Sequence, residues 1–156
     1  MDHLNYYKAS ETDIDILTDI RIKVLIAANK LDSDIDMGLV RNETYQYYME
    51  RIKQDTCVIY LALLDDCIVG TGGICFYRVM PTYNNPYGKK AYIMNMYTEP
   101  EYRKKGIALR MLEYLVEEAK KKHAMEITLE ATDMGKNLYT KYGFDIMENE
   151  MRLLLS

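Results

Sequence analysis

The residues best suited to chemistry form a basic turn just ahead of a long amphipathic run. Residues 99–119 read EPEYRKKGIALRMLEYLVEEA, so that Gly106 follows three cations, Arg103, Lys104 and Lys105. The first amides of a helix have no partner within the helix, and the helix dipole places partial positive charge at that end. Gly106 lets an anion approach these amides, and the cations can pair with phosphate oxygens. The turn therefore predicts an anion site, with a pyrophosphate as the favoured ligand.

The same turn also has a purely structural interpretation. Basic residues are common in surface turns, so Lys104 and Lys105 could be a solvated cap and Gly106 only a turn residue. Ligands of α/β sheets bind at the carboxyl ends of strands, and the turn follows a predicted strand. Its position favours a ligand, although the residues alone leave both interpretations open.

Other familiar sites do not fit the residue spacing. The turn lacks the second glycine and the Lys-Ser/Thr pair of a Walker loop. The stretch GTGGIC, residues 70–75, lies within a strand pattern, so its glycines are interpreted as places for a bulge or a close approach. The chain has two histidines and three cysteines without C-x-x-C spacing, which argues against a metal site and a Cys-His nucleophile pair. We expect no metal, and we expect the cysteines to be buried reduced thiols.

Hydrophobic periodicity predicts the elements that must position the turn. The expected order is β-α-α-β-β-β-α-β-α-β-β, which is a mixed α/β (α+β) sheet with helices on both faces. The strand, helix and strand around the turn would form a right-handed parallel crossover. The predicted segments after an N-terminal strand are helices from Asp13 to Asn29 and from Asn42, strands 56–64 and 67–79 about an Asp65-Asp66 turn, strand 91–98, the helix after the turn, strand 125–132, helix 133–142 and a closing hairpin at 144–155 about Glu148-Asn149.

Bulk composition limits the class of protein. Apolar residues make up 49% and charged residues 28%, as in soluble globular proteins, and 156 residues suit a single domain, residues 1–156. The net charge of −4 argues against a surface built for nucleic acid. Neither a signal-peptide pattern nor a membrane-length apolar segment is present, so we expect a cytoplasmic protein with no membrane partner.

Two stretches resemble one known family. The segment MNMYTEPEYRKKGIALRMLEYLVEEA, residues 94–119, resembles the central motif of the GCN5-related N-acetyltransferase (GNAT) superfamily. That motif is Arg or Gln, two residues, Gly, any residue, then Gly or Ala, and Arg103, Gly106 and Ala108 satisfy it. LYTKYGF, residues 138–144, resembles the family's late helix-to-strand segment. With the element order, the resemblance spans nearly the whole chain and implies a GNAT-type fold.

The resemblance implies an N-acetyltransferase that moves an acetyl group from acetyl-CoA directly to a primary amine in a ternary complex. The turn amides would bind the pyrophosphate of coenzyme A, and the preceding strand would bind its pantetheine arm. The Met96 amide would donate to the thioester oxygen, where negative charge develops. The implied acetyl-CoA residues are Met96, Tyr97, Thr98, Arg103, Lys104, Lys105, Gly106, Ile107 and Ala108.

The resemblance also implies catalytic groups. Tyr139 corresponds to the general acid that protonates the departing thiolate. Glu130, at the end of its strand, is the candidate general base. Simple packing of Tyr139 and a surface role for Glu130 remain alternatives. Thr132 and Gly135 stand where the family often has Asn and Ala, which puts the usual pantetheine contact there in doubt.

The acceptor is the least defined part of the prediction. In this fold the loop between the first two helices borders the acceptor pocket, so Asp32 and Asp36 would attract a cationic amine of a small molecule or peptide. Tyr83 and Asn84 could line the same pocket, and a solvated acidic loop is the alternative. Dimers are common in the family, so a homodimer is one expected assembly. A non-catalytic acyl-CoA-binding module is the alternative function.

Overall fold

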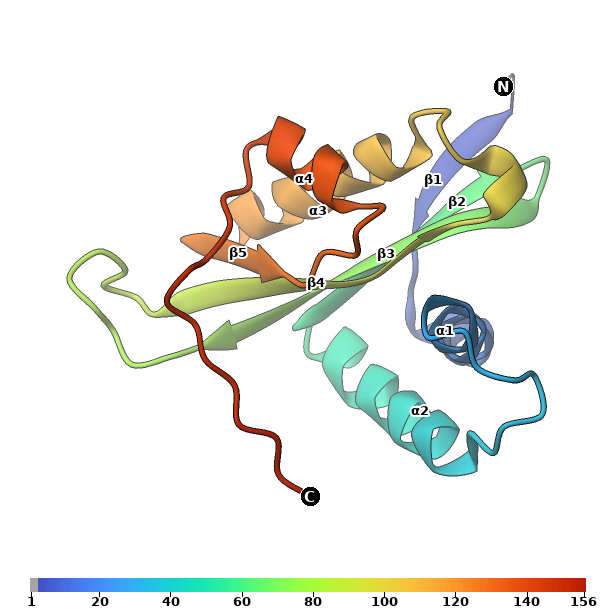
Figure 1. Ribbon diagram of the computed structural model, residues 1–156, viewed down its shortest axis with the longest axis horizontal. Coiled ribbons are helices and arrows are strands. Elements are labelled where there is room, and N and C mark those ends of the chain that lie inside the picture. Colours follow the sequence, from blue (N-terminus) through green and yellow to red (C-terminus); the bar gives the residue numbers. More distant parts are fainter. Residues whose placement is uncertain (1–2) are drawn as a thin grey trace.

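One mixed β-sheet organises the molecule. The structure is a computed structural model and describes residues 3–156. Its five strands lie in the order β1-β2-β3-β4-β5, as Figure 1 shows. Neighbouring strands are antiparallel except β4 and β5, which are parallel. The strands are β1 Leu4–Lys8, β2 Cys57–Leu64, β3 Cys67–Arg78, β4 Lys89–Thr98 and β5 Glu126–Leu129.

Helices cover both faces of this sheet (Figure 1). One apolar cluster lies between the sheet and α3 and α4, and a second lies between β2 and the pair α1 and α2. The predicted mixed α/β class with helices on both faces is therefore confirmed. The helices are α1 Ile14–Ala28, α2 Gly38–Lys53, α3 Ile107–Lys121 and α4 Lys136–Tyr142, and short 3-10 turns cover Glu11–Asp13 and Pro100–Tyr102.

Helix α3 is the central packing element. Met111, Leu112 and Leu115 are at most 1% exposed, and they repeat at helical spacing toward the sheet. Glu118 is also buried on this helix. Its carboxylate accepts a hydrogen bond from the Tyr60 hydroxyl at 2.8 Å and pairs with Lys8 Nζ at 3.2 Å. The apolar stripe and the Glu118 contacts together hold α3 against the sheet.

The turn between β2 and β3 follows the prediction. Asp65 and Asp66 have φ values of 49° and 66°, the left-handed pair that a tight two-residue hairpin turn requires. Aspartate tolerates this region because its short side chain hydrogen-bonds locally. Cys67, directly after the turn, is exposed and Cys75 is half-buried, so the expectation that all three cysteines are buried holds fully only for Cys57.

Several predicted boundaries differ from the structure. Helix α2 begins at Gly38 rather than Asn42, and the Gly38 amide donates to Asp36 Oδ1 at 2.9 Å, which satisfies one of the amides that the first turn of a helix leaves free. Strand β5 ends at Leu129 rather than at residue 132, since β4 pairs with it only as far as Ile93. Among residues 3–156, no helix is long and apolar enough to cross a membrane.

The predicted closing hairpin over residues 144–155 is wrong. These residues form neither helix nor strand, and the chain only bends at Glu148 and Asn149 before it continues outward. An alternating apolar pattern reports a tendency to pair, and a strand forms only where a neighbouring strand accepts its hydrogen bonds. Residues 144–155 find no such neighbour within residues 3–156. The sheet therefore ends at β5.

Candidate active site

The basic turn between β4 and α3 has an unusual backbone. After Thr98 the chain makes the 3-10 turn Pro100–Tyr102, and α3 begins at Ile107. Lys104 and Gly106 both lie in the left-handed region, with φ values of 61° and 85°. A left-handed residue reverses the chain sharply, and glycine enters this region without steric cost. This geometry places the end of β4 directly beside the start of α3.

The amides of this turn are open to an anion. Within residues 3–156 the N–H groups of residues 104–109 donate to no protein acceptor, and the first helical hydrogen bond runs from Arg110 N to Gly106 O at 3.1 Å. The first turn of α3 carries no acidic residue. A Cβ built on Gly106 meets no heavy atom within 4 Å, so no distant part of the chain crowds the turn at Gly106. The helix start has the open, positively polarised geometry that anions prefer.

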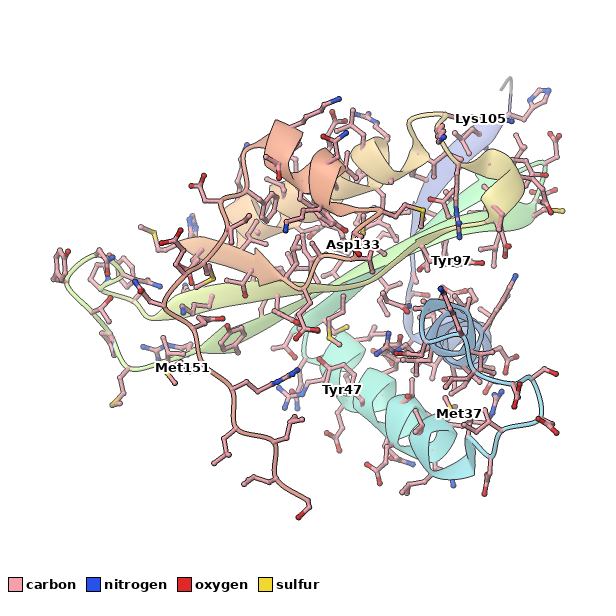
Figure 2. All side chains as sticks on the ribbon, viewed as in Figure 1. Met37, Tyr47, Tyr97, Lys105, Asp133 and Met151 are labelled. Carbon is pink, nitrogen blue, oxygen red and sulfur yellow. The ribbon has the colours of Figure 1, made fainter. Side chains whose placement is uncertain are left out.

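The three cations of the turn differ in their contacts with the rest of the chain. Arg103 folds back: its Nε donates to the Thr98 carbonyl at 2.9 Å, and its guanidinium lies 5.5 Å from the centre of the Tyr97 ring. It therefore braces the turn against the end of β4. Lys104 and Lys105 are exposed, and Figure 2 shows Lys105 at the turn. Lys105 Nζ lies 5.5 Å from the centre of the Tyr102 ring, and as exposed cations both lysines can still reach a bound anion.

Strands β4 and β5 pair only over part of their length. Pairing runs from Lys90 opposite Glu126 to Ile93 opposite Leu129, so residues 94–98 of β4 have no partner on the β5 side. A β-bulge lies in this unpaired part, where Asn95 and Met96 stand opposite the single residue Gly72 of β3. Because strands that separate leave backbone groups free on one edge, this part of β4 can pair with an extended ligand.

The bulge is held from two sides. Asn95 has a φ of 63°, and its Oδ1 accepts a hydrogen bond from Arg21 Nη1 of α1 at 3.0 Å. A Cβ on Gly72 would lie 2.6 Å from Met96 Sδ and 2.7 Å from Met111 Cγ. Gly72 therefore permits the close approach of β4 and α3, as its interpretation as a strand glycine predicted. No sequence motif indicated Arg21, because its partner is far along the chain.

Tyr139 lies on α4 with its ring 8% exposed. The ring packs edge to face on Phe144 at a centroid distance of 5.7 Å, and its hydroxyl has no hydrogen-bond partner among residues 3–156. Burial raises the pKa of the Tyr139 phenol, so it stays protonated at neutral pH. A protonated phenol without an internal partner can donate a proton or a hydrogen bond to a ligand.

Glu130 is exposed and directly follows β5. Burial, and then the charge of Glu130, raise the pKa of the Tyr92 phenol. Tyr92 alternates with Ala91 and Ile93, which are buried on the α3 side. Glu130 therefore lies near the face of the sheet opposite α3, beside the point where β4 and β5 separate.

The expected acceptor residues do not come together. Asp32 and Asp36 are exposed in the loop between α1 and α2, and Asp36 accepts the hydrogen bond of the first amide of α2. Tyr83 and Asn84 lie in the exposed loop that precedes β4, whereas the basic turn follows β4. Ten strand residues separate the two ends of β4, a distance of roughly 30 Å. Figure 1 shows the α1–α2 loop and the loop before β4 at opposite ends of the molecule.

One polar cluster on the α2 side was not predicted. The Tyr47 hydroxyl donates to Cys75 Sγ at 3.0 Å, and Cys75 is the cross-strand partner of buried Cys57. The neighbouring Cys57 thiol and the Tyr47 hydroxyl lower the pKa of the Cys75 thiol, although burial alone would raise it. Figure 2 labels Tyr47 on α2 beneath the sheet. The cluster depends on the register that sets Cys57 opposite Cys75, and this register is known only once β2 and β3 are paired.

Comparison with known proteins decides the family. Residues 27–144 match the family model described as the acetyltransferase (GNAT) family, and this range contains β4, the basic turn, α3, β5 and α4. The chain belongs to the GNAT acetyltransferase family. The resemblance predicted from the two motifs is therefore confirmed. No curated protein matches the chain.

Solved structures show the same GNAT fold. A crystal structure of a predicted acetyltransferase with acetyl-CoA, from Clostridium acetobutylicum, is 37% identical over 97% of this chain and 96% of that chain, with a TM-score of 0.88. Glucosamine-6-phosphate N-acetyltransferase from Arabidopsis thaliana is 16% identical over 98% and 99% of the chains, with a TM-score of 0.68. An aminoglycoside acetyltransferase from an uncultured soil metagenomic sample is 14% identical over 99% and 97%, with a TM-score of 0.74. The last two show likeness of fold alone.

Proposed function

We propose that this GNAT protein is an acetyl-CoA-dependent N-acetyltransferase that moves the acetyl group directly to a primary amine in a ternary complex. One observation carries the proposal: the left-handed turn at Lys104 and Gly106 leaves the first amides of α3 without protein acceptors. The Clostridium relative, 37% identical, supports acetyl-CoA as the ligand because its structure was solved with acetyl-CoA. No metal takes part in the proposed reaction.

The proposed binding mode follows the backbone from the turn toward the bulge. The amides of residues 104–108 hold the diphosphate, and Lys104 and Lys105 add charge at its rim. Arg103 braces the turn from below through the Thr98 carbonyl. The unpaired edge of β4 at Met96, Tyr97 and Thr98 takes the pantetheine arm, whose amides resemble those of a strand.

The proposed chemistry uses one fixed donor and two proton carriers. The Met96 amide, held at the bulge, donates to the thioester oxygen as the amine nitrogen attacks the carbonyl carbon. The carbon–sulfur bond then breaks, and Tyr139 gives its proton to the departing thiolate. Glu130 accepts the proton that the amine loses, directly or through a water molecule. Positioning of both substrates supplies much of the rate, and no covalent enzyme intermediate is needed.

The proposed acceptor is a primary amine on a small molecule or a peptide. Two fold neighbours are named for amine substrates, glucosamine 6-phosphate and aminoglycosides, and these names belong to those proteins. The exposed carboxylate of Asp32 offers negative charge to a cationic amine at the α1–α2 loop. The choice among such amines is the first thing that an assay must establish.

The test is release of free thiol from acetyl-CoA across a panel of polyamines, amino acids, amino sugars, aminoglycosides and lysine peptides. Thermal unfolding with coenzyme A alone is measured in parallel, because a ligand that binds only the folded state raises the melting temperature. We expect stabilisation by coenzyme A together with thiol release for at least one class of amine. Stabilisation without release from any amine would instead favour a non-catalytic acyl-CoA-binding module. Absence of both effects would contradict the proposal.

A further inference from the structure

Cys57 and Cys75 face each other across two neighbouring strands. They are direct partners in the antiparallel pairing of β2 and β3. The Phe76 amide donates to the Thr56 carbonyl at 2.9 Å, so these two residues form a hydrogen-bonded pair. Pairs alternate along an antiparallel ladder, which makes Cys57 and Cys75 a non-hydrogen-bonded pair, the kind whose side chains lie closer together. The two thiols therefore project from the same face of the sheet at close range.

The separation of the two cysteines suits a disulfide. The Cα atoms of a non-hydrogen-bonded pair lie about 4.5 Å apart, within the range of about 4.4–6.8 Å that disulfides span. Both side chains belong to the apolar cluster between β2 and the helices α1 and α2. A sulfur–sulfur bond between them would thus need no large movement of either strand.

The two cysteines differ in their access to solvent. Cys57 is 4% exposed, whereas Cys75 is half-buried. A small oxidant can therefore reach Cys75 from outside, while Cys57 waits on the protein side of the same pair. A partly accessible thiol beside a second, sheltered thiol is the arrangement of a reacting cysteine and its resolving cysteine.

The surroundings of Cys75 favour its thiolate. The Tyr47 hydroxyl on α2 donates a 3.0 Å hydrogen bond to Cys75 Sγ, and Figure 2 shows Tyr47 beneath the sheet. The neighbouring Cys57 thiol lowers the pKa of Cys75, burial opposes this, and the Tyr47 hydroxyl and the charges of Arg21 and Arg51 lower the pKa further. The thiolate is the form of cysteine that attacks other molecules.

Both arginines near Cys75 are held by contacts of their own. Arg21 Nη1 donates to Asn95 Oδ1 at 3.0 Å, and the Arg51 guanidinium lies 5.8 Å from the centre of the Tyr47 ring. Two positioned cations and a hydroxyl donor thus surround one half-buried sulfur atom. A cysteine that only fills space needs neither a donor nor a cation beside it.

We propose that Cys75, Cys57 and Tyr47 form a peroxide-reactive dithiol site, in which a hydroperoxide converts the two thiols into one disulfide. Cys75 is the attacking thiolate, Cys57 is the resolving thiol, and the Tyr47 hydroxyl stabilises the thiolate by its hydrogen bond. The site shares no residue with the basic turn, so it stands apart from the proposed acetyl transfer.

The reaction with hydrogen peroxide balances in two steps. First, the Cys75 sulfur attacks one peroxide oxygen: the sulfur–oxygen bond forms, the oxygen–oxygen bond breaks, and the leaving hydroxide takes up the proton that Cys75 lost and departs as water. Second, the Cys57 sulfur attacks the sulfur of the Cys75 sulfenic acid: the disulfide forms, the sulfur–oxygen bond breaks, and a second water leaves with the Cys57 proton. The two sulfur atoms together lose two electrons, and the peroxide gains them.

The Cys67→Ser variant gives the most direct test, because Cys57 and Cys75 are then the only cysteines of the chain. The reduced protein is treated with hydrogen peroxide at neutral pH, alkylated with iodoacetamide, and analysed by intact mass and on a non-reducing gel. We expect a monomer that has lost two hydrogen atoms, takes up no iodoacetamide, and regains both thiols with dithiothreitol. Stable addition of oxygen in place of the disulfide, or covalent dimers, would overturn the proposal.

Exposed Cys67 is the matched control for reactivity. Combining Cys57→Ser with Cys75→Ser leaves Cys67 alone, directly after the β2–β3 turn. We expect peroxide to consume the thiols of the Cys67→Ser variant about tenfold or more faster than the thiol of Cys67, although Cys67 is the more exposed. Peptide mapping of the wild-type chain, which follows each thiol separately, gives the same comparison without substitution. Equal rates would overturn the proposal.

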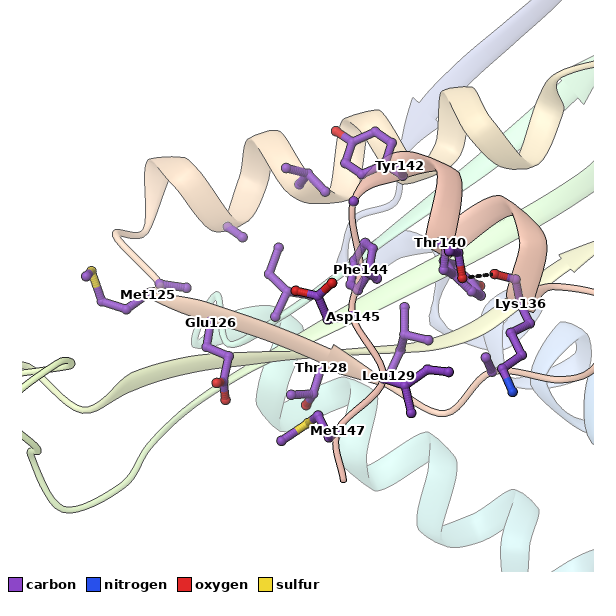
Figure 3. A pocket seen from close by; sticks show the side chains of 18 of the residues that line it. Met125, Glu126, Thr128, Leu129, Lys136, Thr140, Tyr142, Phe144, Asp145 and Met147 are labelled. Carbon is purple, nitrogen blue, oxygen red and sulfur yellow. Dashed lines mark hydrogen bonds between the residues drawn. The ribbon is translucent and has the colours of Figure 1, made fainter. Parts of the chain in front are cut away.

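Tyr47→Phe tests the hydroxyl donor in the Cys67→Ser background. This change keeps the ring and removes the hydrogen bond to Cys75, so the disulfide should form about threefold or more slowly. Tyr142→Phe is the matched control, because Tyr142 is 38% exposed and Tyr47 37%. Figure 3 shows Tyr142 on α4, on the other side of the sheet from α2. Circular dichroism melting verifies that each variant folds, and equal rates for the two tyrosine variants would overturn the site as proposed.

Discussion

Arg21 Nη1 donates a 3.0 Å hydrogen bond to Asn95 Oδ1, across 74 residues of sequence. This contact joins α1 to the bulge of β4, the point at which β4 turns away from β5. Asn95 is held there with a φ of 63°, a conformation that costs about 1 kcal/mol or more for a residue with a side chain. Helix α1 therefore helps to fix the backbone from which Met96 would donate to a thioester.

The Asn95 contact predicts graded effects of substitution. Asn95→Ala loses the hydrogen bond and keeps the steric strain, so we expect the free energy of unfolding to fall by about 1–2 kcal/mol. Asn95→Gly loses the same hydrogen bond but relieves the strain, and should be less destabilised. Urea unfolding of the two variants measures the difference. Equal destabilisation of both would mean that the backbone strain is unimportant.

Gly72 and Gly73 form a matched pair on β3. A Cβ on Gly72 would lie 2.6 Å from Met96 Sδ, whereas one on Gly73 would lie 3.5 Å or more from its nearest neighbours. Gly72→Ala should therefore destabilise the protein by about 1–3 kcal/mol through overpacking, and Gly73→Ala should be nearly neutral. Thermal unfolding of both variants provides the comparison. Similar melting temperatures for the two would contradict the close approach at Gly72.

Tyr139 is expected to affect turnover and not binding. Tyr139→Phe should lower kcat by about 100-fold or more, and leave the Kd for acetyl-CoA nearly unchanged, because only the proton donor is lost. Since burial raises the pKa of Tyr139, wild-type activity should not decline through loss of this proton until the pH exceeds about 10.

The control for Tyr139 lies on the same helix. Tyr142 is 38% exposed, and Tyr142→Phe should retain full kcat. Thiol release with the best amine of the panel gives kcat, and calorimetric titration gives the Kd for acetyl-CoA. An unchanged kcat for Tyr139→Phe would remove this residue as the acid.

Glu118 predicts a pH dependence of stability. Burial alone would raise its pKa, but hydrogen bonds from Tyr60 and Lys8 outweigh burial and lower the pKa below its ordinary value of 4.5. A carboxyl whose pKa is lower in the folded state stabilises the protein above the unfolded-state pKa, and loses this contribution as the pH falls through the folded-state pKa. The contribution of Glu118 should thus be complete at neutral pH and disappear in acid.

Glu118→Gln tests this relationship. We expect the variant to lose about 1–2 kcal/mol of unfolding free energy at pH 7, with the difference from wild type shrinking as the pH falls below the ordinary carboxyl pKa. Glu117→Gln is the control, because Glu117 pairs with Lys120 at the surface and is 60% exposed. Urea titrations at several pH values measure both differences. A Glu118→Gln effect that does not change with pH would show that its charge is unimportant.

Local signals were sufficient to predict the turn and its neighbours. Arg103, Gly106 and Ala108 lie within six residues, and the strand before them and the helix after them have strong periodicity of their own. The two aspartates at 65 and 66 likewise specify a tight turn by their own conformational preference. These features depend on residues close in sequence, so they could be predicted before the fold was known.

Features that depend on distant partners could not be predicted. The Arg21–Asn95 contact and the Tyr47–Cys75 contact exist only once helices and strands are packed. The closing hairpin failed for the same reason, because the pattern of residues 144–155 carries no information about which strand accepts its hydrogen bonds. The start of α2 was missed because the acceptor of the Gly38 amide is the side chain of Asp36, which lies outside the helix.

Binding of coenzyme A to ¹⁵N-labelled protein, followed by two-dimensional amide NMR, tests the central claim most directly. We expect the largest shifts at the amides of Lys104 to Ala108, with Gly106 among them, because these groups would donate to the diphosphate. Gly88 also has a positive φ, 63°, but it lies in the loop before β4, at the other end of that strand from the turn, so its amide is the internal control and should shift little. Saturable binding whose largest shifts lie elsewhere, with the Gly106 amide unmoved, would contradict the account.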